Sequence, residues 1–266
     1  MQTSSPECRV DELRARRLLP FPPTIVDVRR RAAFERDPVR IPMALRHGPE
    51  DVERWASRLD SWRPVVAYCV HGHEVGRDVA AALRRRGFDA VHLAGGLEHW
   101  RESGGPVEPW LPPTRWVTRA RPKVDRLACP WLVRRFIDAS AEFHYVETER
   151  VASFASEHDA VPFDVPDVAY SHAGDRCSFD AFVSRHAPDD AALGALADIV
   201  RAADTDTLQR SPYAPGLVAA SLGMGRGILD DQRLLRHALL LYDALYAWCA
   251  GESHERHGAD PGALPS

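Results

Sequence analysis

The sequence predicts an α/β domain with a central, mainly parallel sheet, followed by a mostly helical α+β domain. Two observations favour this fold class: short apolar runs alternate with helical patterns in the first part of the chain, and amphipathic helical patterns dominate the rest. Between the two parts lies a proline-rich stretch at 104–114, which can continue neither element type. We therefore expect domains at 1–110 and 111–253, with a flexible tail at 254–266.

Three short runs in the first part predict strands. The second of them, PVVAYC, is apolar enough for a strand that is covered on both faces of a sheet. The three runs are Thr24–Arg29, Pro64–Cys69 and Asp89–Gly95. Helical patterns separate them, and this alternation of strand and helix predicts a parallel α/β layer.

The helices between these strands are predicted from apolar residues at helical spacing. The first helix carries them at Val52, Trp55, Ala56 and Leu59. The second carries them at Val75, Val79, Ala82 and Leu83. Gly87 ends the second helix, and the pair Gly95–Gly96 leads into a third helical segment, LEHWRESG.

The second part opens on a predicted strand at 115–120 and a helix at 121–140. A strand is expected at 165–172, and helices are expected at 180–186 and 190–208. The clearest helix is the last, in which apolar residues recur at alternating spacings of four and three. These residues are Leu234, Ala238, Leu241, Leu245 and Trp248.

Composition restricts the function classes. The formal net charge is −4 and Lys123 is the only lysine, so the basic excess typical of nucleic-acid binding is missing and we expect no nucleic-acid partner. No apolar run is long enough for a signal peptide or a membrane span, and the five cysteines form no CxxC pair. We expect a cytoplasmic protein with free thiols and no membrane partner.

Cys69 ends the second predicted strand and is followed by a short polar loop and a helix. Loop N–H groups and the positive end of that helix would both favour a thiolate, which is the reactive form of cysteine. Gly72 permits a close approach of the backbone. The sequence therefore predicts a nucleophile or a persulfide at Cys69, with an anion-binding loop formed by Val70, His71, Gly72, His73 and Glu74.

Several motifs resemble those of rhodanese domains, over about residues 10–107. The matching pieces are VDVR, IPMA, YCVHGHEVG, AAALRRRGFDAVHLAGG and Trp100. The resemblance implies that Cys69 carries sulfane sulfur and passes it to a thiophilic acceptor, without a cofactor. Many active loops of the family carry an arginine or hydroxyl residues where this chain has His73, Glu74 and Val75. The alternative interpretation is a scaffold that binds a partner through an unreacted loop.

Cys129 directly precedes Pro130, and proline favours the first turn of a helix. This order predicts that Cys129 is an N-cap residue, where free N–H groups stabilise a thiolate, with Arg126 as a positive neighbour. The alternative interpretation is a small buried hydrophobic residue beside Trp131.

His172 and Cys177 lie five residues apart across a predicted turn, a spacing at which both can bind one metal ion. Asp125 and Asp204 are candidate ligands from other segments, as are Glu147 and Asp206. A metal ion in the second domain is therefore one expectation. Otherwise the acidic residues are solvated caps or salt-bridge partners, and His172 is a hydrogen-bonded strand residue.

Six ordered motifs of the second part resemble the C-terminal domain of the ChrB-type chromate-resistance family, over about residues 116–249. They are VDRLACPWLVRRFID, PFDVP, SHAGDRCSFDAF, IVRAADTD, LVAASLG and LYDALYAWC. Full-length members are associated with chromate-responsive regulation of an exporter operon, and they carry a different N-terminal region. The rhodanese-like segment found here in its place disfavours a DNA-binding regulatory role.

Two functions follow from the pairing of these domains. The first is an enzyme of the thiosulfate sulfurtransferase type, in which Cys69 takes sulfur from a small donor and passes it to a thiol acceptor such as Cys129, Cys177 or an external thiol. The alternative is a non-catalytic sensor or regulator of chromate resistance that binds an oxyanion.

Overall fold

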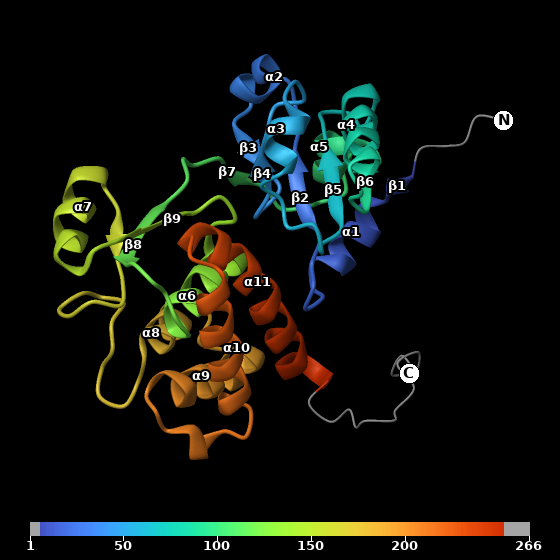
Figure 1. The fold of residues 1–266 in the computed structure, drawn as a ribbon. Coiled ribbons are helices and arrows are strands. Elements are labelled where there is room, and N and C mark those ends of the chain that lie inside the picture. The colour runs from blue at the N-terminus through green and yellow to red at the C-terminus, as the bar shows by residue number, and fades with distance from the viewer. Residues whose placement is uncertain (1–5, 253–266) are drawn as a thin grey trace. The chain divides into compact units, whose positions relative to one another are not determined.

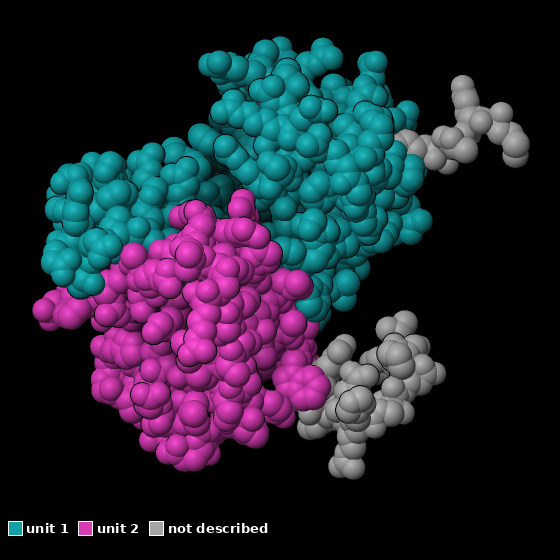
Figure 2. Space-filling model, in the orientation of Figure 1, with its two compact units in different colours: residues 1–117, 132–161 teal, residues 118–131, 162–266 magenta. Residues whose placement is uncertain are grey.

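The computed structural model of the chain describes residues 6–252, and these form two compact units (Figures 1 and 2). Within the described residues, the first unit holds 6–117 and 132–161, and the second holds 118–131 and 162–252. The predicted tail at 254–266 lies outside the described residues. No helix of the described part is long and apolar enough to cross a membrane.

A five-stranded sheet is the centre of the first unit, and its strand order is β1-β6-β5-β2-β4. Its strands are β1 (Glu7–Cys8), β2 (Thr24–Asp27), β4 (Leu45–Arg46), β5 (Val65–Tyr68) and β6 (Ala90–Leu93). Every neighbouring pair is parallel, with Thr24 opposite Val65 and Val65 opposite Ala90. The predicted parallel α/β sheet is confirmed.

Side chains of β5 alternate between two apolar layers, as the period of a strand requires. Val65, Ala67 and the following Cys69 pack with residues of α3 (Val52–Ala56) and α4 (Glu74–Arg85). Val66 and Tyr68 pack with residues of α1 (Val10–Arg16) and α5 (Gly96–Glu102). Figure 1 shows these helices around the sheet. Because both of its faces are covered, β5 is apolar along its whole length.

The remaining elements of the first unit are short. They are α2 (Arg31–Arg36), the antiparallel pair β3 (Val39–Arg40) and β7 (Glu108–Pro109), the π-helix Val133–Ile137, β9 (Glu142–Val146), the 3₁₀ helix Thr148–Arg150 and α7 (Val151–His158). A three-stranded sheet has the order β10-β8-β9, with β8 at Arg115–Arg119 and β10 at Val161–Pro162.

The second unit is helical, as expected. Its helices are α6 (Asp125–Leu132), α8 (Ser178–His186), α9 (Ala191–Asp204), the 3₁₀ helix Leu208–Arg210, α10 (Ala214–Gly227), α11 (Asp231–Ala247) and the π-helix Trp248–Glu252. Two hydrogen bonds tie the start of α6 to α10 and α11. Val124 donates its N–H to Ser221 Oγ at 3.0 Å, and Tyr242 donates its hydroxyl to the carbonyl of Val124 at 2.6 Å.

Two predicted elements differ in the structure. The strand expected at 165–172 is wrong, because this segment is a series of turns with one isolated bridge from Phe163 to Tyr170. Left-handed backbone at Asp164 and Asp167 interrupts any extended strand. The helix expected to start at Cys129 begins at Asp125 instead, and Pro130 lies inside it.

Candidate functional site

Cys69 follows the last residue of β5, so the sheet fixes its position. Its side chain is 6% exposed and lies in the apolar layer beneath α3 and α4. Gly76 in the first turns of α4 faces it, and a Cβ atom at Gly76 would lie 3.4 Å from Cys69 Sγ. The sulfur therefore sits at the bottom of a loop, beside a helical position that has no side chain.

The loop after Cys69 is held by the start of α5. Leu97 and Glu98 donate their N–H groups to the carbonyls of Cys69 and Val70, at 2.9 and 3.1 Å. Gly72 and Gly96 both have positive φ, and a Cβ at Gly96 would lie 2.5 Å from Gly72 N. Glycine is needed at both positions because the two backbone segments touch.

Six consecutive backbone N–H groups of this loop and of the start of α4 have no backbone acceptor among the described residues. Among the residues that the structure describes, none of the N–H groups from residue 71 to residue 76 donates to a backbone carbonyl. Arg77 is the first residue to bond back, to the carbonyl of His73 at 3.2 Å. Free N–H groups at a turn and a helix start form an anion-binding concavity. The loop geometry thus suits a negatively charged sulfur.

The side chains of the loop bring both signs of charge. His71 Nδ1 lies 2.8 Å from Glu98 Oε2, and both side chains are more than half exposed. The ring of His73 lies 5.7 Å from the ring of His71. Glu74 is the first residue of α4. A doubly charged anion that approaches the loop therefore meets two carboxylates as well as two imidazoles.

The second unit contains a cluster of three carboxylates around one imidazole. His172 Nε2 lies 3.3 Å from Asp125 Oδ2, 3.3 Å from Asp164 Oδ1 and 3.2 Å from Asp204 Oδ2. The Asp125 and Asp164 side chains are 3% exposed, whereas His172 is 44% exposed. The cluster joins the start of α6, a turn after β10, a loop and the end of α9.

Asp164 is the member with the most partners. Its Oδ2 pairs with Arg119 at 2.7 Å and with Arg126 at 3.1 Å, and its Oδ1 accepts from Ser178 Oγ at 2.8 Å. These contacts balance the charge of this carboxylate and orient it. Asp125 and Asp204 have no such cationic partner within the described residues except His172.

Burial and mutual repulsion shift the protonation of the cluster. Burial raises the pKa of Asp125 to about 8, and the neighbouring carboxylates Asp164 and Asp204 add to this. The carboxylate of Asp125, 3.3 Å from His172 Nε2, raises the pKa of His172 to about 9. Burial also raises the pKa of Asp204. Three carboxylates at one buried point cannot all ionise unless a positive charge joins them.

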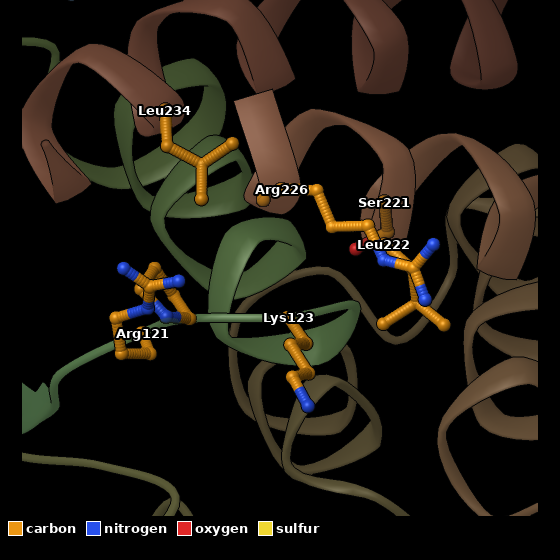
Figure 3. A pocket seen from close by; sticks show the side chains of 8 residues that line it. Arg121, Lys123, Ser221, Leu222, Arg226 and Leu234 are labelled. Atoms are coloured by element: carbon orange, nitrogen blue, oxygen red, sulfur yellow. The ribbon is translucent and has the colours of Figure 1, made fainter. Parts of the chain in front are cut away.

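A pocket of about 360 Å³ lies elsewhere in the same unit (Figure 3). Arg121 and Lys123 line it from the segment before α6, Arg226 from α10 and Leu234 from α11. Within the described residues, no carboxylate lies at ion-pair distance from these three cationic side chains. The pocket therefore combines an apolar wall with three cationic side chains, and Asp231 Oδ2 accepts a hydrogen bond from the backbone N–H of Arg121 at 3.0 Å.

Comparison with known proteins matches two family models to consecutive parts of the chain. The family model of the ChrB C-terminal domain matches residues 116–249, half of the chain. The chain belongs to this family. A second model, that of the rhodanese-like domain, matches residues 10–103. The chain is thus a rhodanese-like domain fused to a ChrB C-terminal domain, as the sequence motifs predict.

Relatives match one domain each. The protein ChrB of Cupriavidus metallidurans is 32% identical over 136 residues, which are 50% of this chain and 40% of that protein. The thiosulfate sulfurtransferase GlpE of Coxiella burnetii is 33% identical over 78 residues, which are 29% of this chain and 70% of that protein. A solved rhodanese-like domain from Anabaena sp. is 31% identical with a TM-score of 0.35, and covers 40% of this chain and 80% of its own.

In the ChrB C-terminal domain the predicted thiolate environment of Cys129 is wrong. Cys129 lies in the interior of α6 with no exposed surface, and burial, followed by the charge of Asp125, raises its pKa well above the ordinary value. Arg126 pairs with Asp164 and donates to the carbonyls of Arg119 and Ala120. Packing beside the buried Trp131 agrees with the alternative interpretation of Cys129 as a small apolar residue.

Three of the four predicted metal ligands meet in the structure: Asp125, His172 and Asp204. Cys177 is instead the N-cap of α8, where its N–H donates to Asp180 Oδ2 at 3.0 Å. Burial raises the pKa of the Cys177 thiol. Asp164 was not predicted, and only its place within the PFDVP motif offered a signal. Asp206 is exposed, and Glu147 is an exposed residue of the first unit.

Proposed function

We propose that the rhodanese-like domain is a sulfurtransferase in which Cys69 carries a persulfide. The observation that carries this proposal is the run of N–H groups from residue 71 to residue 76 without backbone acceptors, in the loop and helix start that directly follow Cys69 at the end of β5. Such groups stabilise a thiolate, a persulfide anion and the anionic donor at the same place. The likeness to a thiosulfate sulfurtransferase over most of that protein's length supports the same reaction class.

The proposed reaction has two displacement steps. The Cys69 thiolate attacks the sulfane sulfur of thiosulfate, a new S–S bond forms, and the S–S bond of thiosulfate breaks as sulfite leaves with the electron pair. A thiophilic acceptor, cyanide or an external thiol, then attacks the outer sulfur and releases the Cys69 thiolate. Burial of Cys129 and Cys177 speaks against either as the acceptor.

The carboxylates near the loop define the donor. Glu74 begins α4, and Glu98 Oε2 lies 2.8 Å from His71 Nδ1. Both disfavour a donor whose reacting end is a dianion, such as thiosulfate, relative to a donor whose reacting end carries at most one negative charge, because like charges repel in a partly desolvated loop. We therefore expect the wild-type protein to turn over glutathione persulfide faster than thiosulfate. We also expect Glu74→Gln to turn over thiosulfate faster than the wild type does.

The decisive experiment is intact mass spectrometry after exposure of the full chain to each donor. We expect one added sulfur atom on the wild-type protein and on Cys249→Ser, a matched control at a less buried thiol. Cys69→Ser should gain none and should lose cyanide-dependent thiocyanate formation. Equal sulfur loading of Cys69→Ser and wild type would rule out Cys69 as the sulfur carrier, and no loading of a folded wild-type protein by either donor would show that the domain is a binding module.

A second candidate function is favoured by the cationic pocket of the ChrB C-terminal domain. Arg121, Lys123 and Arg226 without carboxylate partners suit an oxyanion, and this matches the chromate resistance that the family relationship suggests. Calorimetry with sulfate and chromate tests it. Lys123→Ala and Arg226→Ala should each weaken binding, whereas Arg236→Ala, an exposed arginine on α11, should not. Absence of binding to the wild-type chain would remove this candidate.

A further inference from the structure

Asp125 provides the observation that goes beyond sulfur transfer. Its side chain is 97% buried, and its Oδ2 has no hydrogen-bond partner among the described residues. This oxygen lies 3.3 Å from His172 Nε2, but without the geometry of a hydrogen bond. A buried carboxylate oxygen without a partner destabilises the folded protein by roughly several kcal/mol, unless a bound ion or another group interacts with it.

His172 cannot satisfy the carboxylates around it. One Nε2 atom has three carboxylate oxygens at 3.2–3.3 Å, and a protonated imidazole has only one N–H at that atom. At most one of the three contacts can therefore be a good hydrogen bond. The other two carboxylate oxygens lie close to His172 Nε2 but receive no hydrogen bond from it.

The separations fit the ligands of a single metal ion. Ligand bonds to zinc-type ions are about 2.0–2.2 Å, so ligand atoms at tetrahedral angles lie roughly 3.3–3.5 Å apart and those at right angles about 3 Å apart. The ligand atoms of Asp125, Asp164 and His172 all lie within 4.8 Å of one another. The measured contacts of 3.2–3.3 Å fall within this range.

The charges also leave room for a dication. Arg119 and Arg126 balance Asp164, while the carboxyl groups of Asp125 and Asp204 have His172 as their only cationic partner among the described residues. A divalent ion would neutralise both of them. Ser178 holds Asp164 Oδ1 at 2.8 Å, which is the kind of outer hydrogen bond that orients a ligating carboxylate. The partly exposed ring of His172 provides access from solvent.

We infer that the ChrB C-terminal domain binds one divalent transition-metal ion through Asp125 Oδ2, Asp164 Oδ1 and His172 Nε2. Carboxylates suit manganese and imidazole suits zinc or iron, so this mixed donor set selects a first-row transition ion over Ca²⁺ and Mg²⁺. The site is independent of Cys69, so its test can fail while sulfur transfer holds.

The experiment is a titration of the full chain, stripped with a chelator, with Mn²⁺ and with Zn²⁺, followed by calorimetry and by Mn²⁺ electron paramagnetic resonance. We expect one ion per chain and an upward shift of the melting temperature, since a ligand that binds only the native state stabilises it. Asp125→Asn and His172→Gln should each lower the affinity by at least about tenfold. Asp206→Asn, the same change at an exposed residue two positions from Asp204, should bind as wild type does.

His172→Gln keeps the test sound if Asp125→Asn does not fold, because the exposed ring of His172 tolerates substitution. Circular dichroism checks the fold of each variant. Unchanged affinity in folded His172→Gln would overturn the site, as would a wild-type chain that binds neither ion. In either case the cluster is an ion-pair network alone.

Discussion

Gly76 packs directly against Cys69, with its missing Cβ position 3.4 Å from the cysteine sulfur. A methyl group there is in ordinary contact with a thiol but narrows the space in which an outer sulfur atom can lie. The residue at position 76 of α4 therefore determines how much space an outer sulfur atom on Cys69 has.

Gly76→Ala should preserve the fold and slow sulfur transfer. Alanine favours a helix over glycine by roughly 1 kcal/mol, so we expect equal or slightly higher stability. Displacement of the sulfur should lower thiocyanate formation by about tenfold or more. Gly194→Ala in α9, where a Cβ meets no atom within 4 Å, is the control and should leave turnover unchanged. Full activity in Gly76→Ala would contradict this role for the glycine.

Gly96→Ala should destabilise the rhodanese-like domain. Its Cβ would lie 2.5 Å from both Cys69 O and Gly72 N, and its φ of +61° already disfavours alanine. We expect a loss of more than about 2 kcal/mol in the free energy of unfolding. Gly174→Ala has a similar φ of +63° with open space around it, so it should cost only about 1 kcal/mol. If urea denaturation gave equal losses of unfolding free energy for Gly96→Ala and Gly174→Ala, the close contact of Gly96 with the Cys69 loop would not contribute to stability.

A buried ion pair anchors the segment between β2 and α2. Arg29 Nε contacts both oxygens of Asp27 at 3.0 Å, and both side chains are almost completely buried. Asp27→Asn should cost about 3–5 kcal/mol, because the buried Arg29 guanidinium would keep only the distant carboxylate of Asp37, at 3.9 Å, as a charged partner. Glu35→Gln breaks the exposed pair with Arg31 and should change stability by less than about 1 kcal/mol. Comparable melting temperatures for the two variants would refute this ranking.

His47 should make stability depend on pH. It stacks on Trp55 at 4.8 Å, and burial, together with Arg46 and Arg58, lowers its pKa to about 4. The unfolded state takes up the proton at about pH 6.5, so between pH 6.5 and 4 the unfolded state binds more protons and stability falls as the pH falls. After discount for partial exposure we expect a loss of about 1–2 kcal/mol at pH 5.

Urea denaturation of wild type and His47→Gln at pH 7 and pH 5 measures this contribution. The variant has no imidazole to protonate at this position, so its stability should fall less between the two pH values. A fall as large as that of the wild type would assign the pH dependence to other groups.

The strands and the Cys69 loop were predictable because their causes are local. A strand buried on both faces must be apolar along its length, as at Val65–Tyr68. In a parallel sheet, the residue after such a strand lies at the carboxyl ends of the strands, where the loops that bind ligands are found. The helical layers on the two faces of the sheet then follow from the alternation of strands and helices along the chain.

The ChrB C-terminal domain was less predictable because its causes are not local. Proline prefers the first turn of a helix, yet burial of Cys129, Trp131 and Leu132 holds Pro130 in the interior of α6. Asp164 lies in a turn with no ligand spacing to His172, and only the folded chain brings them together.

Lys123 lines the cationic pocket and carries the only lysine amine of the whole sequence. An amine-reactive reagent can therefore modify only one side chain, that of Lys123. A fluorophore or photo-crosslinker coupled to it would report directly on the pocket. Occupancy by an anion becomes measurable as protection from acylation, without any engineered cysteine.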